Sequence, residues 1–301
     1  MDEKAMGNPR VFIGGISVGG EAAGANGDKE SSNVSRARCC ATRETTGGTA
    51  AEALDNAVSG ERTRSGWIDA DVTDAQAMEM LRGVCSGVRP CLSRRGYRFV
   101  KRAFDIAASG VAIGLLFVPG VLLSAAICIK SPGAGPFYSQ ARVGRVRRDG
   151  TYRFFRMWKF RSMVPHADEM LDELKERNEA DGPLFKIKDD PRVISGVGSF
   201  IRKHSIDELP QLVNVFLGDM SLVGPRPALP KEVVQYDAYA MHRLAVKPGC
   251  GGAWQVSGRS DSTFEEMVEL DIDYIERRSA GFDLALIFET LRSMLTGRGA
   301  Y

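Results

Sequence analysis

One long uncharged stretch limits the folds that this chain can adopt. Ile106–Ile129 comprises 24 residues without a charged side chain. As one straight helix they would span about 36 Å, enough to cross the roughly 30 Å hydrocarbon core of a bilayer. A buried helix of a soluble protein is disfavoured, because Gly110, Gly114 and Pro119 are poor helix formers. The stretch therefore predicts a membrane-embedded segment.

The centre and the flanks of this stretch bear on its topology. Pro119-Gly120 interrupts it, and each half would reach about 16–20 Å, near the bilayer midplane. Basic residues stand on both sides: Arg94, Arg95, Arg98, Lys101 and Arg102 before it, and Lys130, Arg142, Arg145, Arg147 and Arg148 after it. Because the positive-inside tendency retains both flanks, we expect a re-entrant helix–break–helix that enters and leaves the same leaflet. A kinked transmembrane helix is the alternative.

Charge and cysteine content narrow the class of partner. The first 90 residues carry 10 basic and 13 acidic side chains, and the other 211 carry 30 and 25. The part with the apolar stretch is thus the basic part, which suits an anionic membrane surface or phosphate substrates. No nucleic-acid motif is visible, so nucleic acid is not expected. The six cysteines lack the CxxC spacing of zinc or redox sites, which indicates a reducing, cytosolic setting.

Composition divides the chain into three regions. Residues 1–93 are rich in small residues and contain two aromatics, so we expect a disordered, low-complexity extension with one short helix near Asp71–Leu81. Residues 94–130 form the basic-flanked membrane segment. Residues 131–301 are predicted to form a compact cytosolic catalytic domain. The predicted fold is α+β and mostly helical, in a monotopic membrane protein.

Local patterns place several elements in that domain. Short strands are expected at Pro136–Gln140 and Tyr152–Met157 around an Asp149-Gly150 turn, and another at Leu184–Lys188. Helices are expected at His166–Glu179, Ser205–Leu217, Phe264–Arg277 and Phe282–Leu295. The last helix places Leu284, Ile287, Phe288, Leu291 and Leu295 on one face, which could be core or could lie on the membrane.

Two adjacent carboxylates, Asp207 and Glu208, open the predicted Ser205–Leu217 helix. One interpretation is structural: Ser205-x-x-Glu208 is a capping box, and Asp207 suits the positive helix end. The other is chemical, because a helix N-terminus gathers phosphates. With Mg²⁺ neutralising those phosphates, a carboxylate can attack phosphorus and form an acyl phosphate.

Basic residues near this pair are candidates for phosphate binding. Arg202 precedes the acid pair, and Lys159 lies in the basic-aromatic sequence Trp158–Arg161. Arg226 stands between Pro225 and Pro227, whose rings restrict the backbone and would preorganise a bidentate phosphate clamp. An exposed arginine in a turn is the alternative for Arg226.

The motifs taken together resemble one family, the bacterial sugar transferases, which are monotopic polyprenyl-phosphate phosphoglycosyl transferases. The resemblance runs from about residue 98 to the end. It is carried by Lys101–Asp105, Phe137–Gly144, Trp158–Met163, Asp190–Arg192, Ser205–Gln211, Gly218–Pro227, Lys247–Gly249, Trp254–Arg259 and Gly299–Tyr301.

The resemblance implies a reaction and roles for residues. Asp207 would attack the sugar-bearing phosphate of a UDP-sugar and release UMP, and undecaprenyl phosphate would then take the phosphosugar. Glu208 would assist with Mg²⁺ or proton transfer, and both carboxylates are candidate metal ligands. Lys159, Arg202, Pro225, Arg226 and Pro227 are predicted to bind substrate, as are Lys101 and Arg102 of the first motif.

The same resemblance implies a place in the cell and leaves specificity open. It implies the cytoplasmic face of the bacterial inner membrane, contact with lipid, and the first membrane step of a surface polysaccharide, with downstream glycosyltransferases as further partners. Galactose or glucose is the expected sugar, by analogy alone. One departure stands out: Cys250-Gly251-Gly252 replaces the family's usual Thr-Gly pair. The competing hypothesis is a non-catalytic membrane scaffold for glycan enzymes.

Overall fold

A computed structural model describes residues 72–82, 84–167, 169–170, 174, 190–257 and 263–296. The predicted strand Leu184–Lys188 lies outside the described residues, as does most of the predicted helix His166–Glu179. The helices are α2 (Asp74–Arg82), α3 (Arg95–Lys130), α5 (Val197–Lys203), α6 (Gln211–Leu217), α7 (Pro230–Val233), α8 (Ala253–Ser257), α9 (Phe264–Arg277) and α10 (Ala280–Thr296). The strands are β1 (Phe137–Val143), β2 (Phe154–Phe160), β3 (Ser221–Val223) and β4 (Gly249–Gly251), and 3-10 turns cover η3 (Ile206–Glu208) and η4 (Ala240–Ala245).

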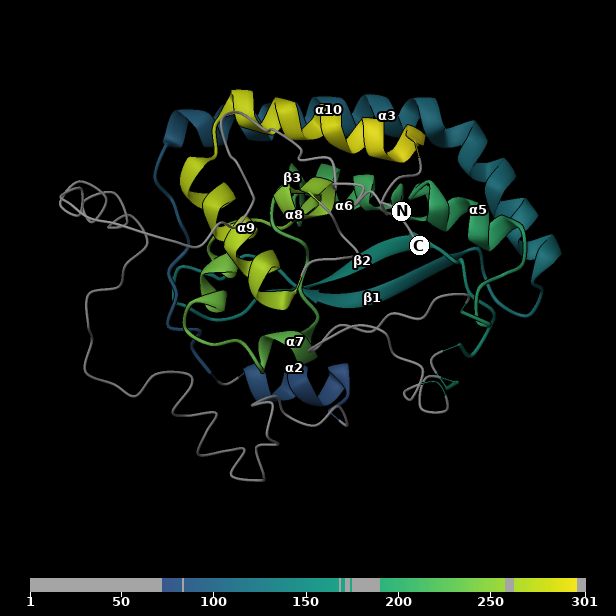
Figure 1. Cartoon of the computed structure of the whole chain (residues 1–301), viewed down its shortest axis with the longest axis horizontal. Coiled ribbons are helices and arrows are strands. Elements are labelled where there is room, and N and C mark those ends of the chain that lie inside the picture. Colours follow the sequence, from purple (N-terminus) through teal and green to yellow (C-terminus); the bar gives the residue numbers. More distant parts are fainter. Residues whose placement is uncertain are drawn as a thin grey trace, which may run out of the picture. The chain divides into compact units, whose positions relative to one another are not determined.

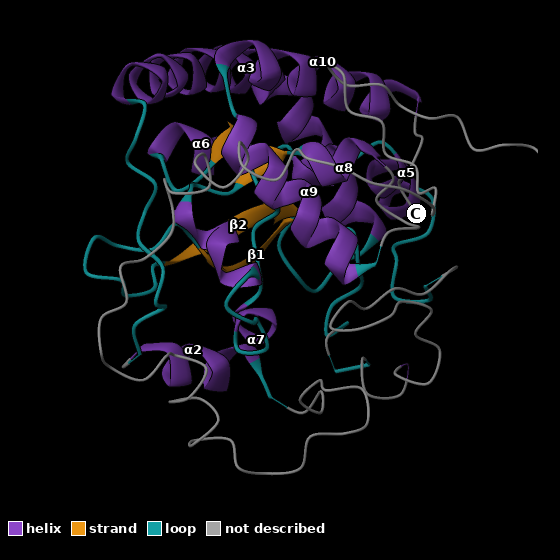
Figure 2. Cartoon of the chain, turned by 60° about the vertical axis from the view of Figure 1, so that its left-hand side comes forward, coloured by secondary structure: helices purple, strands orange, loops and turns teal. Residues whose placement is uncertain are grey.

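These elements stack in layers. The helices α3 and α10 run side by side along one edge, at the top of Figure 1. The shorter helices α5, α6 and α8 form the next layer, and the ribbon of β1 and β2 lies beneath them (Figures 1 and 2). The small helices α7 and α2 pack on the far side of that ribbon. The mixed helix and strand content agrees with the predicted α+β class.

The ribbon confirms the two predicted strands and lengthens both. Antiparallel pairing joins β1 and β2 from Phe137 opposite Phe160 to Val143 opposite Phe154. One face of β2 places Phe155 and Met157 in a buried cluster with Val215 of α6 and Met220. This burial fixes α6 over the ribbon, and it removes apolar area from water on both elements.

The apolar segment forms a single bent helix. Helix α3 has 36 residues and contains Pro119, so the prediction that Pro119-Gly120 separates two helices is wrong. Figure 1 shows a bend in the later part of α3. Proline removes one backbone donor and crowds the preceding turn, which bends a helix without ending it when neighbouring turns remain paired.

Both ends of α3 are held by the same domain. Near its start, Arg102 donates to the carbonyls of Val215 and Phe216 at 2.7 and 2.8 Å. Near its end, Ile127 is fully buried in a cluster with Phe160. The guanidinium of Arg161 then donates to the Ser131 and Gly135 carbonyls just past the helix, at 2.5 and 2.7 Å.

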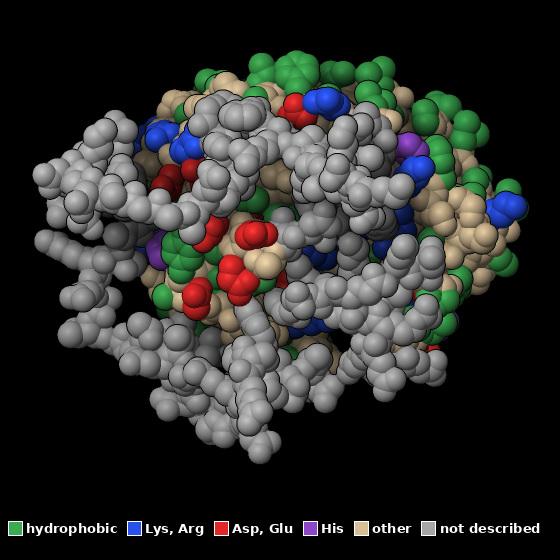
Figure 3. All heavy atoms as spheres, viewed as in Figure 1, with side chains coloured by type: hydrophobic (Ala, Val, Ile, Leu, Met, Phe, Trp, Pro, Cys, Tyr) green, Lys and Arg blue, Asp and Glu red, His purple; other side chains and the backbone are tan. Residues whose placement is uncertain are grey.

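Between these anchors, α3 presents an exposed apolar surface. It is long and apolar enough to cross a membrane, and only 6% of its most apolar window is buried. The surface continues onto α10, and Figure 3 shows hydrophobic side chains along that edge of the molecule. More than half exposed are Phe99, Val111, Leu115, Phe117 and Leu122 of α3, and Phe288, Leu291 and Leu295 of α10. For α10, this exposure favours the membrane alternative over a core face.

Part of the predicted N-terminal extension is folded. Helix α2 lies close to the short helix expected at Asp71–Leu81, and its Ala77 and Leu81 are fully buried. Farther on, the Ser86 amide donates to the Gly150 carbonyl at 2.9 Å and the Cys91 amide to the Ala245 carbonyl at 2.8 Å. The described residues between 72 and 93 are therefore folded, where disorder was expected. The predicted boundary at residue 93, between the extension and the membrane segment, stays a prediction.

Candidate active site

The two carboxylates lie in a single 3-10 turn. The predicted continuous helix over Ser205–Leu217 is wrong: η3 covers Ile206–Glu208, and α6 starts anew after Pro210. Proline lacks the N–H that a continuous helix would direct to the Ile206 carbonyl. Ser205 adopts a left-handed backbone with φ of 53°, and its side chain makes no cap hydrogen bond, so the capping-box interpretation also fails.

Burial and a shared lysine set the electrostatics of the pair. Asp207 is 8% exposed, whereas the Glu208 side chain is 35% exposed. Lys159 of β2 places its ammonium 2.7 Å from Glu208 Oε1 and 3.8 Å from Asp207 Oδ2. The pKa of Asp207 is raised from 3.8 to about 6: burial is the main cause and Glu208 adds to it, while Lys159 and Arg202 oppose the rise. Asp207 is thus ionised at neutral pH but weakly solvated, which suits a nucleophile.

A cavity of about 200 Å³ opens beside Lys159 and Glu208. It is lined by Arg142, Met157, Lys159, Glu208, Gln211, Arg226, Pro227, Trp254 and Gln255. Three of these side chains are cations and one is an anion, so the cavity has the charge expected of a phosphate site. Four predicted site residues therefore meet here, from β2, η3 and the Pro225–Pro227 corner.

Arg226 is held in place by a buried carboxylate. Its Nη1 donates to Glu232 Oε1 at 3.1 Å, and Glu232 also accepts from the Leu229 amide at 2.9 Å. The Glu232 side chain is 2% exposed and that of Arg226 is 25% exposed, so the guanidinium still reaches the cavity. Nearby Arg226 and Arg142 outweigh burial and hold the pKa of Glu232 below its usual range.

Arg142 of β1 is a second buried guanidinium at this cavity. It donates to the Pro227 carbonyl and to Gln140 Oε1, both at 2.8 Å. Its Nε is buried without a hydrogen-bond partner among the described residues. Burial, reinforced by Arg226, lowers the pKa of Arg142 to about 10. Arg226 pairs directly with Glu232, whereas the charge of Glu232 acts on Arg142 without a direct ion pair, and Arg142 Nε keeps donor capacity for an anion.

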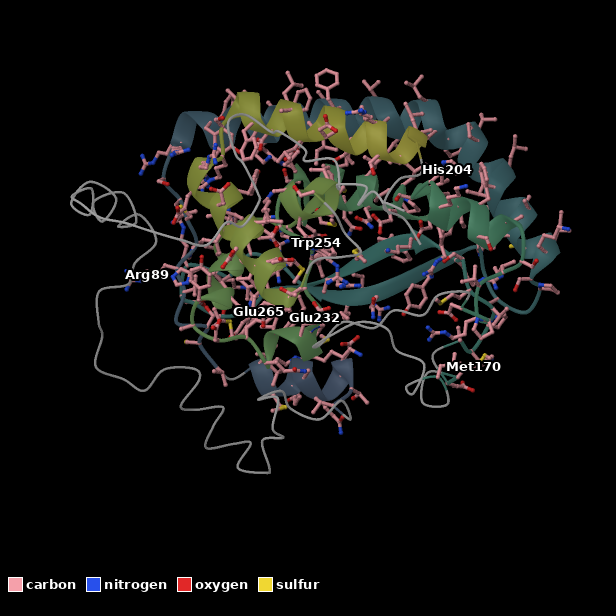
Figure 4. The ribbon with its side chains drawn as sticks, in the orientation of Figure 1. Arg89, Met170, His204, Glu232, Trp254 and Glu265 are labelled. Carbon is pink, nitrogen blue, oxygen red and sulfur yellow. The ribbon has the colours of Figure 1, made fainter. Side chains whose placement is uncertain are left out.

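Trp254 of α8 forms part of the cavity wall. The Arg226 guanidinium lies 5.9 Å from the centre of its ring, a cation–π arrangement. The indole N–H is buried and makes no hydrogen bond to any described residue. Figure 4 labels Trp254 and Glu232 near the same end of the β1–β2 ribbon.

A match along two thirds of the chain identifies the family. The protein-family model described as "Bacterial sugar transferase" matches residues 96–297. The chain belongs to the bacterial sugar transferase family. That membership confirms the resemblance found in the motifs, and the match includes α3 from its second residue onward and every residue of the cavity.

Curated sugar transferases share this part of the sequence. The chain is 45% identical over 201 residues to "Galactosyl transferase CpsE" of Streptococcus agalactiae, covering 66% of this chain and 43% of that protein. It is 40% identical to "Undecaprenyl-phosphate galactose phosphotransferase" of Salmonella typhimurium, covering 70% of this chain and 43% of the relative. It is also 40% identical to "Exopolysaccharide production protein ExoY" of Rhizobium meliloti, covering 67% of this chain and 88% of that protein. The chain thus spans less than half the length of the first two.

Five predicted site residues of this sugar transferase do not line the cavity, and one of them is Asp207, which lies beside the cavity residue Lys159. Lys101 pairs with Asp283 at 2.8 Å, and Arg102 binds the carbonyl end of α6. The Pro225 carbonyl accepts from the Gly249 amide at 2.9 Å, which makes it part of the β3–β4 junction. Arg202 does not line the cavity, although it is close enough to influence the pKa of Asp207.

The predicted Mg²⁺ site is incomplete in protein ligands. The described residues include no group of three or more His, Cys, Asp or Glu side chains that could hold a metal ion. Asp207 and Glu208 nevertheless fit Mg²⁺, which commonly takes one or two carboxylates and completes its shell with substrate phosphates and water.

The motifs contained further site residues whose roles were not predicted. Arg142, Gln211, Trp254 and Gln255 all lie in sequences that carry the family resemblance. Their place within those motifs was the available signal. Glu232 lies outside those stretches, and its role depends on a partner six residues away.

Proposed function

We propose that this protein transfers a sugar 1-phosphate from a UDP-sugar to undecaprenyl phosphate and releases UMP. The observation that carries the proposal is the buried carboxylate of Asp207 beside a cationic cavity. Family membership and the names of the relatives support the class of donor and acceptor. A related protein of Escherichia coli, 36% identical, is named "UDP-glucose:undecaprenyl-phosphate glucose-1-phosphate transferase".

In the first half-reaction, an Asp207 carboxylate oxygen attacks the phosphorus that carries the sugar. The bond from that phosphorus to the bridging oxygen breaks, and UMP leaves with the bonding electron pair. Asp207 then carries the sugar phosphate as an acyl phosphate. Its burial leaves the attacking oxygens with little hydration to shed.

In the second half-reaction, a phosphate oxygen of undecaprenyl phosphate attacks the same phosphorus. The acyl phosphate bond breaks, Asp207 regains its negative charge, and undecaprenyl-diphosphate-sugar is formed. Lys159, 3.8 Å from Asp207 Oδ2, would stabilise that returning charge.

The cations of the cavity would stabilise the phosphates through both steps. Arg226 and Arg142 offer planar donor groups at positions fixed by Glu232 and the Pro227 carbonyl. Preorganised donors of this kind favour the extra charge on the phosphoryl oxygens in the transition state. Bound Mg²⁺, held by Glu208 and Asp207 with the donor diphosphate, would supply further charge neutralisation.

The membrane arrangement belongs to the same proposal: α3 enters and leaves one leaflet, with the catalytic domain on the cytoplasmic face. Its start and its end both contact that domain, through Arg102 and Ile127. A helix crossing the bilayer would place these two contacts on opposite sides. The bend in α3 and the basic residues on both of its flanks also favour a helix that enters and leaves the same leaflet.

The sugar and the pathway are proposed from relatives. Two similar proteins have galactose or galactosyl in their names, and another is named for exopolysaccharide production. We therefore expect galactose or glucose as donor sugar and the first membrane step of a polysaccharide, ahead of further glycosyltransferases. Nothing in the comparisons supports the scaffold hypothesis.

A panel of UDP-sugars tests this function. The full chain, with undecaprenyl phosphate and Mg²⁺, should release UMP fastest from UDP-galactose or UDP-glucose. Asp207→Asn should lower the rate by at least about a thousandfold, because an amide is a poor nucleophile. Asp273→Asn changes a carboxylate paired at the surface with Arg277 and should leave the rate unchanged. A wild-type protein that never releases UMP would instead favour the scaffold.

A further inference from the structure

A second cavity, also of about 200 Å³, lies where the first turns of α3 meet β3 and the segment before β4. Its lining shares no residue with the cavity beside Glu208. It contains one carboxylate, that of Asp105, and six cationic side chains: Arg98, Lys101, Arg102, Arg145, Lys247 and Arg278. This excess of positive charge in a partly enclosed space is unusual unless an anion balances it.

Only some of these cations have an ion-pair or hydrogen-bond partner among the described protein groups. Lys101 has Asp283 as its partner, and Arg98, Arg102 and Arg278 donate to carbonyl groups. Lys247 and Arg145, in contrast, have no hydrogen bond or ion pair with any described residue. Burial together with Arg102 and Arg145 lowers the pKa of Lys247 to about 8. The cavity thus holds two cationic groups with free donor capacity.

An apolar groove leaves this cavity between α3 and α10. The groove has a volume of about 210 Å³ and shares Tyr97, Lys101, Asp105 and Val223 with the cavity. Its other walls are Val100, Phe104, Leu222, Ala280, Asp283, Leu284 and Ile287. Val100, Phe104 and Leu284 are 56%, 45% and 47% exposed, so the groove opens onto the apolar edge of the molecule seen in Figure 3.

We propose that the cavity and groove bind an anionic glycerophospholipid of the surrounding bilayer. Its phosphate lies against Lys247 and Arg145, and one acyl chain lies in the groove between α3 and α10. Charge complementarity selects an anionic headgroup, and the continuous apolar groove selects a lipid over a free anion. Because this cavity is separate from the one beside Lys159 and Glu208, the bound lipid is a non-substrate that fixes the catalytic domain on the leaflet.

Lipid binding to the full chain in detergent tests the inference. Phosphatidylglycerol should remain bound in native mass spectrometry and raise the melting temperature, whereas phosphatidylcholine should do neither. Lys247→Gln with Arg145→Gln should weaken phosphatidylglycerol binding at least tenfold. Arg145→Gln alone is the second variant in case the pair does not fold. The charge-matched control, Arg89→Gln with Arg148→Gln, alters two exposed cations outside the cavity and should stay within twofold of wild type.

Three results would overturn it. The first is equal phosphatidylglycerol binding by wild type and both cavity variants. The second is an equal melting shift from inorganic phosphate, which would make the site a simple anion site. The third is undecaprenyl phosphate binding at least tenfold tighter than phosphatidylglycerol with the same dependence on Lys247, which would make it an acceptor site. Asp207→Asn should keep lipid binding, so this inference and the proposed transferase activity fail separately.

Discussion

The burial of Asp207 has opposite consequences for activity and for stability. Its pKa of about 6 in the folded chain exceeds its ordinary 3.8, so the folded protein holds this proton more tightly than the unfolded chain. Its contribution to stability is therefore full below pH 3.8 and is lost as the pH rises through 6. At pH 7 the ionised buried group destabilises the fold by at most about 3 kcal/mol.

Asp207→Asn should accordingly raise stability while it abolishes turnover. The expected gain at pH 7 is at most about 3 kcal/mol, a net figure that already includes the attraction between Asp207 and Lys159. Thermal unfolding of wild type and variant at pH 7 and at pH 4.5 measures the difference in stability between them. That difference should be smaller at pH 4.5. A variant less stable than wild type at pH 7 would contradict the assigned pKa direction.

The same ionisation predicts the acid side of the activity profile. UMP release should fall about tenfold for each pH unit below 6, because only the ionised carboxylate attacks phosphorus. Initial rates between pH 5 and 8 at saturating UDP-sugar give the profile. A rate independent of pH down to 5 would exclude a nucleophile with this pKa.

At the scale of elements, Asn214 attaches α6 to the ribbon. Its Oδ1 accepts from the Trp158 amide at 3.1 Å, and its Nδ2 donates to the Arg156 carbonyl at 2.7 Å. Asn214 is 1% exposed, so Asn214→Ala should leave both backbone groups without a partner and cost about 2–4 kcal/mol. Asn214→Asp keeps the acceptor and should cost less. Chemical denaturation orders the three proteins, and equal stability would refute this role.

Gly251 of β4 lies against a side chain of α10. A Cβ on Gly251 would lie 2.6 Å from Thr290 Oγ1 of α10. Gly251→Ala should therefore cost about 1–3 kcal/mol, and Thr290→Ala should recover part of that loss. A double-mutant cycle by thermal unfolding measures the coupling, and additive effects would show that the two positions do not interact. The contact lies within Cys250-Gly251-Gly252, the stretch that departs from the family's usual Thr-Gly pair.

Elements were predictable where local signals were sufficient. The helix expected at Phe264–Arg277 has these bounds in the structure, because Thr263 and Glu266 form a complete capping box. The similar pattern at Ser205 and Glu208 fails because Pro210 interrupts the hydrogen bonding that a longer helix needs. The continuity of α3 through Pro119 also depends on packing of its second half, which local rules do not contain.

The kind of site could be predicted from the sequence, but only some of the residues that line it could be. Lys159, Glu208 and Arg226 do meet, as the phosphate interpretation required. Lys101 and Arg102 could not be separated from them in sequence, because a motif shows proximity along the chain and not the direction of a side chain. Glu232 and Arg142 act through partners on other elements, and their roles follow only from the fold.

At the scale of the whole molecule, topology decides whether the catalytic domain and both ends of α3 share one side of the bilayer. Cys85 is exposed before α3, and Arg148→Cys supplies a reporter after it. In chains whose other cysteines are replaced by Ser, neither reporter should react with an impermeant maleimide in intact cells, and both should react after lysis. Labelling of Cys85 in intact cells would support a crossing helix instead.

The central claim is that Asp207 carries the phosphosugar, and a single turnover without acceptor tests it most directly. Purified chain incubated with UDP-galactose or UDP-glucose and no undecaprenyl phosphate should release about one UMP per active chain. Intact-mass measurement should show one added hexose phosphate, located on the peptide that contains Asp207, and Asp207→Asn should show neither. UMP release that requires undecaprenyl phosphate, with no adduct in its absence, would contradict the account and indicate direct transfer.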